Sequence, residues 1–259
     1  LSAQTGVPVV THHEPEDRAL DGLEKMLKAY PKARVAVAHF GQIRHPDRQT
    51  RFGPELVRRL LTAYPNLYYE LSTGQPNRKY KCEGRVLDTV IWQDDGPDHQ
   101  TDTLKPAYKA ILSDFSDRFV GGTDYGGGRR PLAEHLAKKV ANLRLIMRDL
   151  PKSAQHNIGY RNAWRLLTGR AWNTASATAA AKSAPATRPR PYGGVISDAH
   201  GHLQGKKTDP DAVIEAMDRN NIDRVVIWVK RQGGWTDDDT LEFHGRFPDR
   251  VVAGIAFQN

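Results

Sequence analysis

The stretch VISDAHGHL, residues 195–203, decides how the rest of the sequence is interpreted. An apolar run ends there in His200 and His202, and residues i and i+2 of an extended strand project to the same side. Gly201 leaves space between them, so the pair predicts a metal site at the end of a strand. The residues expected to complete this site come earlier in the chain. The pair that would open a barrel therefore stands last in the sequence.

Strands and helices alternate along most of the chain. Apolar runs predict strands at residues 7–11, 34–38, 67–71, 118–121, 194–197, 224–229 and 251–257. Helical periodicity predicts helices at residues 18–29, 54–63, 104–114, 131–150, 162–167, 211–220 and 237–247, and a long polar stretch lies at 72–102. This alternation predicts an α/β fold in which crossover helices connect the strands of a parallel sheet.

An abrupt change of composition divides the chain. Residues 171–191 consist mainly of Ala, Ser, Thr and Pro and lack the apolar periodicity needed to pack, which indicates a linker. The predicted organisation is therefore a first part at 1–170, a linker at 171–192 and a second part at 193–259.

Composition excludes several classes of protein. The net charge is +8, but the basic residues are scattered and form no recognised motif, so nucleic-acid binding is not expected. The single cysteine, Cys82, excludes an internal disulfide and a cysteine-based metal site. No apolar run approaches the roughly 18 residues that cross a bilayer, so no membrane association is expected. A cytoplasmic location is slightly favoured, although the start at Leu1 leaves the compartment open.

Three further residues stand at predicted strand ends, where a parallel barrel carries its active site: His12, His39 and Asp124. Each has an ordinary explanation by itself; Asp124, for example, could bond the amides of a turn. Together with His200 and His202 they predict a site for one divalent metal ion. Neutral imidazoles with a carboxylate suit zinc, with manganese or iron as alternatives.

Several motifs in combination resemble the amidohydrolase-related family of the metal-dependent hydrolase superfamily. VISDAHGHL is similar to the first strand of the family, VPVVTHHE to the fifth, ARVAVAHFG to the sixth, PNLYYELS to the seventh, and RFVGGTDYGG followed by NAWRLL to the eighth strand and final helix. The resemblance implies a TIM-type barrel and either metal-assisted hydrolysis or nonoxidative decarboxylation.

The resemblance also implies roles for individual residues. His39 would orient the metal-bound water or the substrate, and Asp124 could also carry a proton. His12 is preferred over His13, and Glu14 is a candidate supporting group. No lysine matches the bridging ligand of two-metal relatives, which favours a single metal ion. The implied ligands of that ion are His12, Asp124, His200 and His202.

The order of the motifs departs from the family pattern. Strands five to eight come first, then the linker, then strands one to three, and strand four has no counterpart. The predicted barrel is therefore incomplete or permuted. A fragment of a tandem protein is preferred over a circular permutation, because Leu1 is an unusual start and the chain stops just after a strand. In a tandem the early and late histidines would serve different ions; in a permuted barrel they would share one.

The predicted function is hydrolysis of a small organic substrate by metal-activated water. Nonoxidative decarboxylation at the same site is one alternative, and a noncatalytic pseudo-enzyme or scaffold is another. Basic residues in the loops, including Arg44, Arg48, Arg78, Lys79 and Arg85, with Trp92 beside them, would suit a carboxylate-bearing substrate but are equally explained as surface. The expected partners are that substrate and either the missing barrel segments or a second copy of the chain.

Overall fold

The structure is a computed structural model that describes residues 2–12, 15–42, 50–76, 91–94, 100–126, 132–172, 192–203, 209–229 and 234–254. Among these residues no helix is both long and apolar enough to cross a membrane. Most of the predicted linker, Glu14 and the five basic loop residues lie outside the described ranges.

The first sheet contains four parallel strands in the order β1-β2-β3-β6. Their bounds are β1 Val9–Thr11, β2 Val35–Val37, β3 Leu67–Glu70 and β6 Phe119–Val120. Helices α2 (Asp17–Ala29) and α3 (Pro54–Ala63) connect the first three strands. In α2, Leu20, Leu23 and Leu27 share one face and are buried, which explains why this polar segment folds as an amphipathic helix.

The second sheet contains the remaining parallel strands in the order β10-β9-β8-β7. Their bounds are β7 Tyr125–Gly126, β8 Ile196–Leu203, β9 Ile222–Val229 and β10 Val251–Gly254. Helix α8 (Pro210–Arg219) connects β8 to β9, and α9 (Asp237–Arg246) connects β9 to β10. Strand β8 is longer than the predicted strand, so both histidines of the VISDAHGHL stretch lie within it. All of its residues are buried, as expected for a central strand of a parallel sheet.

The two sheets meet where β6 leads into β7. The amide of Ala199 donates to the carbonyl of Gly121 at 2.9 Å, and the amide of Asp124 donates to the carbonyl of His200 at 2.8 Å. The strands thus follow one another from β1 to β10 across this junction, and no pairing within the described residues joins β1 to β10. The mixed α/β fold with parallel sheets is confirmed, whereas the incomplete or permuted barrel and the three-part organisation stay predictions.

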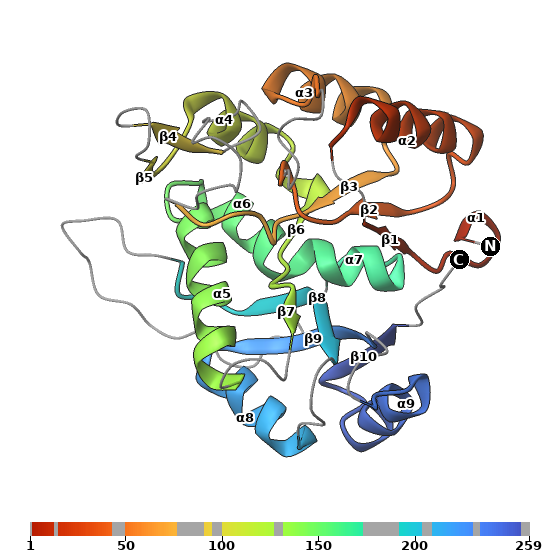
Figure 1. Ribbon diagram of the computed structural model, residues 1–259. Helices are drawn as coiled ribbons and strands as arrows, with labels where there is room; N and C mark the ends of the chain where they lie inside the picture. The colour runs from red at the N-terminus through yellow and green to blue at the C-terminus, as the bar shows by residue number, and fades with distance from the viewer. Residues whose placement is uncertain are drawn as a thin grey trace.

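Helix α7 (Asn162–Thr168) lies between the two sheets (Figure 1). Its residues Ala163 and Leu166 pack with a small cluster of side chains that come from four strands of both sheets: Ala36, Tyr68, Val120 and Ala199. The larger core cluster also draws on both sheets and on the surrounding helices. Shared packing of this kind fixes the two sheets relative to one another.

The structure of the polar stretch at 72–102 was predicted least well from the sequence. An antiparallel pair, β4 (Trp92–Asp94) and β5 (Gln100–Leu104), begins within it and ends just beyond it. The buried Trp92 donates from Nε1 to the carbonyl of Gly74 at 2.8 Å. Leu104 ends β5, and the helix predicted from that residue, α4, begins at Pro106, because proline is accommodated in the first turn. The short helix α1 (Ser2–Thr5) was also not predicted.

Helices α5 and α7 follow the prediction with small changes of boundary, whereas α6 and two short helical turns were not predicted. Helix α5 spans Leu132–Met147, shorter than the predicted 131–150. A 3-10 turn at Ser116–Arg118 precedes β6. Helix α6 (Lys152–His156) continues through a π-helical turn at Asn157–Arg161 into α7.

Candidate metal centre

His200 and His202 project from the same side of β8, as their spacing predicts. Their exposed fractions are 0% and 3%, and their Nε2 atoms are 2.9 Å apart. A side chain at Gly201 would place its Cβ 2.9 Å from Cγ2 of Val225, so glycine allows β8 to lie close to β9. The local backbone therefore presents two imidazoles together on a tightly packed strand.

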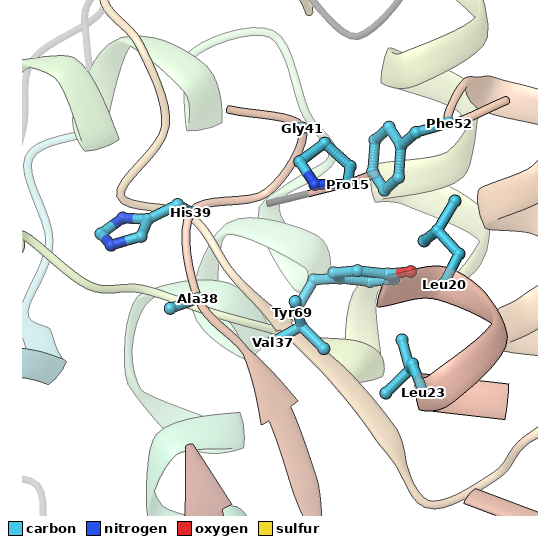
Figure 2. Close-up of a pocket in the computed structure, with 9 residues that line it drawn as sticks. All are labelled: Pro15, Leu20, Leu23, Val37, Ala38, His39, Gly41, Phe52 and Tyr69. Atoms are coloured by element: carbon cyan, nitrogen blue, oxygen red, sulfur yellow. The ribbon is translucent and has the colours of Figure 1, made fainter. Parts of the chain in front are cut away.

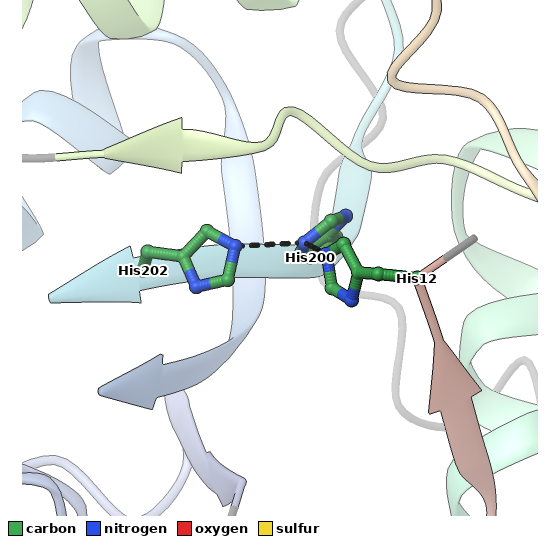
Figure 3. Close-up of side chains that lie close together, drawn as sticks. All are labelled: His12, His200 and His202. Atoms are coloured by element: carbon green, nitrogen blue, oxygen red, sulfur yellow. Dashed lines mark hydrogen bonds between the residues drawn. The ribbon is translucent and has the colours of Figure 1, made fainter. Parts of the chain in front are cut away.

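His12 joins this pair from the first sheet. It follows the last residue of β1, and its Nε2 lies 3.0 Å from Nε2 of His200 (Figure 3). His12 is the exposed member of the three. A cluster of three imidazole nitrogens is thus assembled from residues that are 188 positions apart in the chain.

Asp124 and His39 border the cluster at two turns. Asp124 Oδ1 lies 3.3 Å from Nε2 of His202 and 3.8 Å from Nε2 of His200. The rings of His39 and His200 have centroids 5.1 Å apart. Both His39 and Asp124 adopt a left-handed backbone, with φ of 61° and 46°. Such conformations are uncommon for residues other than glycine and are concentrated at functional sites.

The described residues contain two overlapping triads with potential ligand atoms within 4.8 Å of one another. One is His12, His200 and His202, and the other is His39, Asp124 and His200. The five predicted ligand and catalytic residues therefore belong to one connected cluster within this chain, while the candidate supporting residue Glu14 lies outside the described residues. Their roles as ligands or as catalytic groups stay predictions.

Glu70 is the principal member of the site that the sequence analysis missed. It ends β3, is fully buried, and its Oε2 lies 2.9 Å from Nδ1 of His200. Period-two alternation places it on the same side of the strand as Tyr68, which belongs to the cluster between the sheets. The signal was available in the sequence: a carboxylate at the end of an otherwise apolar and aromatic strand.

Asp198 holds the backbone around His200. Its Oδ1 accepts from the amides of Thr123 and His200, each at 3.0 Å, and its Oδ2 accepts from the hydroxyl of Thr123 at 2.5 Å. These bonds tie β8 to the turn that carries Asp124. Burial raises the pKa of Asp198 to about 6, against the opposing effect of those bonds.

The electrostatics of the cluster favour neutral imidazole at its exposed member. Although His12 as a residue is exposed, its ring is partly desolvated by the neighbouring rings; this desolvation, and then the charge of His200, lower the pKa of His12 to about 3. Burial also lowers the pKa of His39, which Glu70 and Asp124 only partly offset. Neutral imidazole is the form that coordinates a metal ion.

The carboxylates make the centre of the cluster attractive to positive charge. Burial opposes a charge on His200, yet the attraction of Glu70 and its hydrogen bond raise the pKa of His200. Burial likewise opposes ionisation of Asp124, but the hydrogen bond from His202 and the charges of His200 and Lys139 hold its pKa well below the usual range. Nζ of Lys139, on α5, lies 3.6 Å from Oδ2 of Asp124.

Trp228 of β9 forms an aromatic wall beside the histidines. Its ring centroid lies 5.4 Å from that of His200 and 6.2 Å from that of His202. A Cβ added at Gly254 would lie 1.3 Å from Nε1 of Trp228, so glycine at the end of β10 is needed for this placement of the indole. Trp228 also packs against His12, with 6.5 Å between the ring centroids.

A small cavity of about 10 Å³ lies next to His39 and is too small for an organic substrate. It is lined by Pro15, Leu20, Leu23, Val37, Ala38, His39, Gly41, Phe52 and Tyr69. The ring of His39 points away from the apolar side chains of this group (Figure 2). The cavity therefore belongs to the packing behind His39.

Comparison with known proteins gives one family match. A family model described as amidohydrolase matches residues 2–168, more than half of the chain. No curated protein and no solved structure matches the chain. The matched region includes His12, His39, Glu70 and Asp124, while the VISDAHGHL stretch follows it.

Proposed function

Because this chain belongs to the amidohydrolase family, whose members are metal-dependent hydrolases and decarboxylases, we propose that it is a hydrolase of a small organic substrate. The observation that supports the proposal most strongly is the convergence of Nε2 atoms from His12, His200 and His202. We assign these three residues and Asp124 as ligands of one divalent cation, with zinc preferred.

The donor set fits such a cation. Imidazole nitrogens and carboxylate oxygens are both ligands of zinc in proteins, and here they lie beside a second, fully buried carboxylate, Glu70. Within the described residues the ion pairs of Glu70 include no lysine or arginine; its charged partner is His200. A buried anion compensated only by neutral or weakly basic groups favours a cation nearby.

When bound, a divalent cation supplies Lewis-acid polarisation of a substrate or water oxygen. The residues of the chain contribute orientation and proton transfer. Nδ1 of His39 is bonded to Ser72 Oγ at 2.8 Å, which leaves Nε2 of His39 to accept or return a proton. Asp124 offers an ionised carboxylate 3.8 Å from Nε2 of His200.

A carboxylate-bearing substrate, and with it decarboxylation as the second candidate reaction, is favoured by one observation. Lys139 places its ammonium group beside Asp124, and its side chain is 30% exposed. A cation at that position would attract an anionic group of the substrate to the same end of the site. Replacement of Lys139 by Met should then raise KM for acidic substrates more than for neutral ones.

The test of the proposed function is metal content followed by activity. Protein purified without chelator should hold about one divalent ion per chain, measured by mass spectrometry of the metals. It should hydrolyse or decarboxylate members of a small-substrate panel, and chelation should abolish that activity, which zinc should restore. A protein that holds no ion under these conditions, or that keeps full activity after replacement of His39 and Asp124, contradicts the proposal.

A further inference from the structure

We propose that Glu70 is a positioning residue that sets which ring nitrogen carries the proton in both His200 and His39. By doing so it leaves the unprotonated Nε2 atoms of both rings facing the proposed metal site. The importance of this arrangement for metal binding rests on the function proposed above, but the proton pattern itself does not.

The carboxylate of Glu70 is surrounded by donors. Oε2 accepts from Nδ1 of His200 at 2.9 Å, from the hydroxyl of Ser72 at 2.6 Å and from the amide of His39 at 3.2 Å. Oε1 accepts from the amide of Ser72 at 2.5 Å. One carboxylate thus contacts one histidine through its ring and the other through its backbone.

These contacts determine the position of the protons. An ionised carboxylate can only accept, so the Glu70 contact requires a proton on Nδ1 of His200. The hydroxyl proton of Ser72 is directed to Glu70, so Ser72 Oγ accepts from Nδ1 of His39 at 2.8 Å. The carbonyl of Ser72, 3.3 Å from the same nitrogen, also requires a donor there. In the neutral form of each ring, Nε2 is then the lone-pair nitrogen.

The position of Glu70 is also fixed sterically. A Cβ at Gly122 would lie 2.0 Å from its Oε1, so the absence of a side chain at Gly122 is what makes room for the carboxylate. The residue is fully buried, and burial of a carboxylate is costly unless hydrogen bonds compensate. Both carboxylate oxygens accept hydrogen bonds, and a glutamine offers only one acceptor oxygen in this position.

The proton pattern can be observed directly in the metal-free protein. Nitrogen-15 chemical shifts of the histidine rings, recorded at alkaline pH where the rings are neutral, should show Nδ1 protonated and Nε2 unprotonated for both His200 and His39. Assignment uses single His→Asn variants. A protonated Nε2 in neutral His200 would overturn the proposal.

Variants separate positioning from a general structural role. Glu70→Gln removes the charge and replaces one of the two acceptor oxygens by an N–H donor, so it should loosen the hold on the Nδ1–H form of His200. It should weaken Zn²⁺ binding by about 10- to 100-fold in competition with a chromophoric chelator. Glu24→Gln, the same change in a carboxylate on α2 that bonds Arg59 and Tyr64, should leave Zn²⁺ affinity unchanged. Equal affinities for Glu70→Gln and the wild type would contradict the proposal.

Ser72→Ala separates the effect of Glu70 on His200 from its effect on His39. This variant also keeps the test valid if Glu70→Gln fails to fold. It removes the hydroxyl link to His39 and retains the Glu70–His200 bond, so His200 should keep its proton on Nδ1. Loss of that form in Ser72→Ala would assign the control of His200 to Ser72 and overturn the proposal. If the wild-type protein bound no Zn²⁺ at all, the proposed function would fail, while the ring shifts would still decide the role of Glu70.

Discussion

The two halves of the candidate metal centre differ in how firmly the fold holds them. The half on β8 contributes His200 and His202 from a strand that pairs on both sides, and both are buried. The half on β1 contributes His12 from a strand that pairs only with β2 among the described residues, and His12 is exposed. Replacing a histidine on β8 should therefore lower both the stability of the protein and its affinity for metal. Replacing His12, after β1, should lower metal affinity alone.

The difference extends to the supporting groups. His200 is held by Glu70 through its ring and by Asp198 through its amide. The contacts of His12 within the described residues are with other rings of the cluster: those of His39, His200, His202 and Trp228. A ligand that is held by its neighbours is preorganised, whereas one that is held mainly by the cluster depends on the ion for its order.

His200→Ala should produce the largest effect. It removes the residue shared by both triads and leaves the buried Glu70 without its charged partner, which is expected to cost about 3–5 kcal/mol. Urea unfolding of the metal-free protein measures the stability, and Zn²⁺ competition measures the affinity. His156→Ala, at a histidine near the end of α6, is the control. An unfolding free energy equal to that of the wild type would show that β8 is not the more constrained half.

Gly122→Ala should destabilise the protein without changing any titratable group. The added Cβ would overlap Oε1 of Glu70, and an overpacked site of this kind costs about 1–3 kcal/mol. The matched control is Gly22→Ala in α2, where no atom lies within 4 Å of the added carbon. That change should instead stabilise by about 0.5–1 kcal/mol, because alanine favours the helix. If both variants shift the urea midpoint in the same direction, the steric role of Gly122 beside Glu70 is contradicted.

His12→Ala should separate metal affinity from stability. Because His12 is exposed, its removal should change the unfolding free energy of the metal-free protein by no more than about 0.5 kcal/mol. Zn²⁺ affinity should nevertheless fall clearly, since one of three converging imidazoles is lost. Unchanged Zn²⁺ affinity would remove His12 from the ligand set.

Glu24→Gln should have the smallest effect on the metal centre, because it leaves Zn²⁺ affinity unchanged, and it shows how a carboxylate near the surface differs from Glu70. The hydrogen bond from Arg59 lowers the pKa of Glu24, so the pair contributes above the pKa of the unfolded chain and is lost as pH falls through the lower folded value. The expected loss at neutral pH is below about 1 kcal/mol. Wild type and variant should therefore converge in stability in acid, as measured by thermal unfolding across pH; a difference that grows in acid would contradict this.

The sequence was most informative where the signal is local. The apolar runs that became β2, β3 and β9 and the amphipathic helix α2 were predicted because strand and helix periodicities are properties of neighbouring residues. The antiparallel pair of β4 and β5 was missed because most of its residues are polar and its apolar residues are stabilised by partners elsewhere, such as Gly74, whose carbonyl accepts the bond from Trp92.

The same distinction applies to the site. The sequence alone determined that histidines and a carboxylate stand at strand ends, since the strand pattern and the His200–His202 spacing are written in adjacent residues. Only the tertiary structure decided which atoms meet. Glu70 and His200 are 130 positions apart, and His12 and His200 are 188 apart. Their contacts depend on how β3, β8 and β1 are placed across two sheets, which no local pattern encodes.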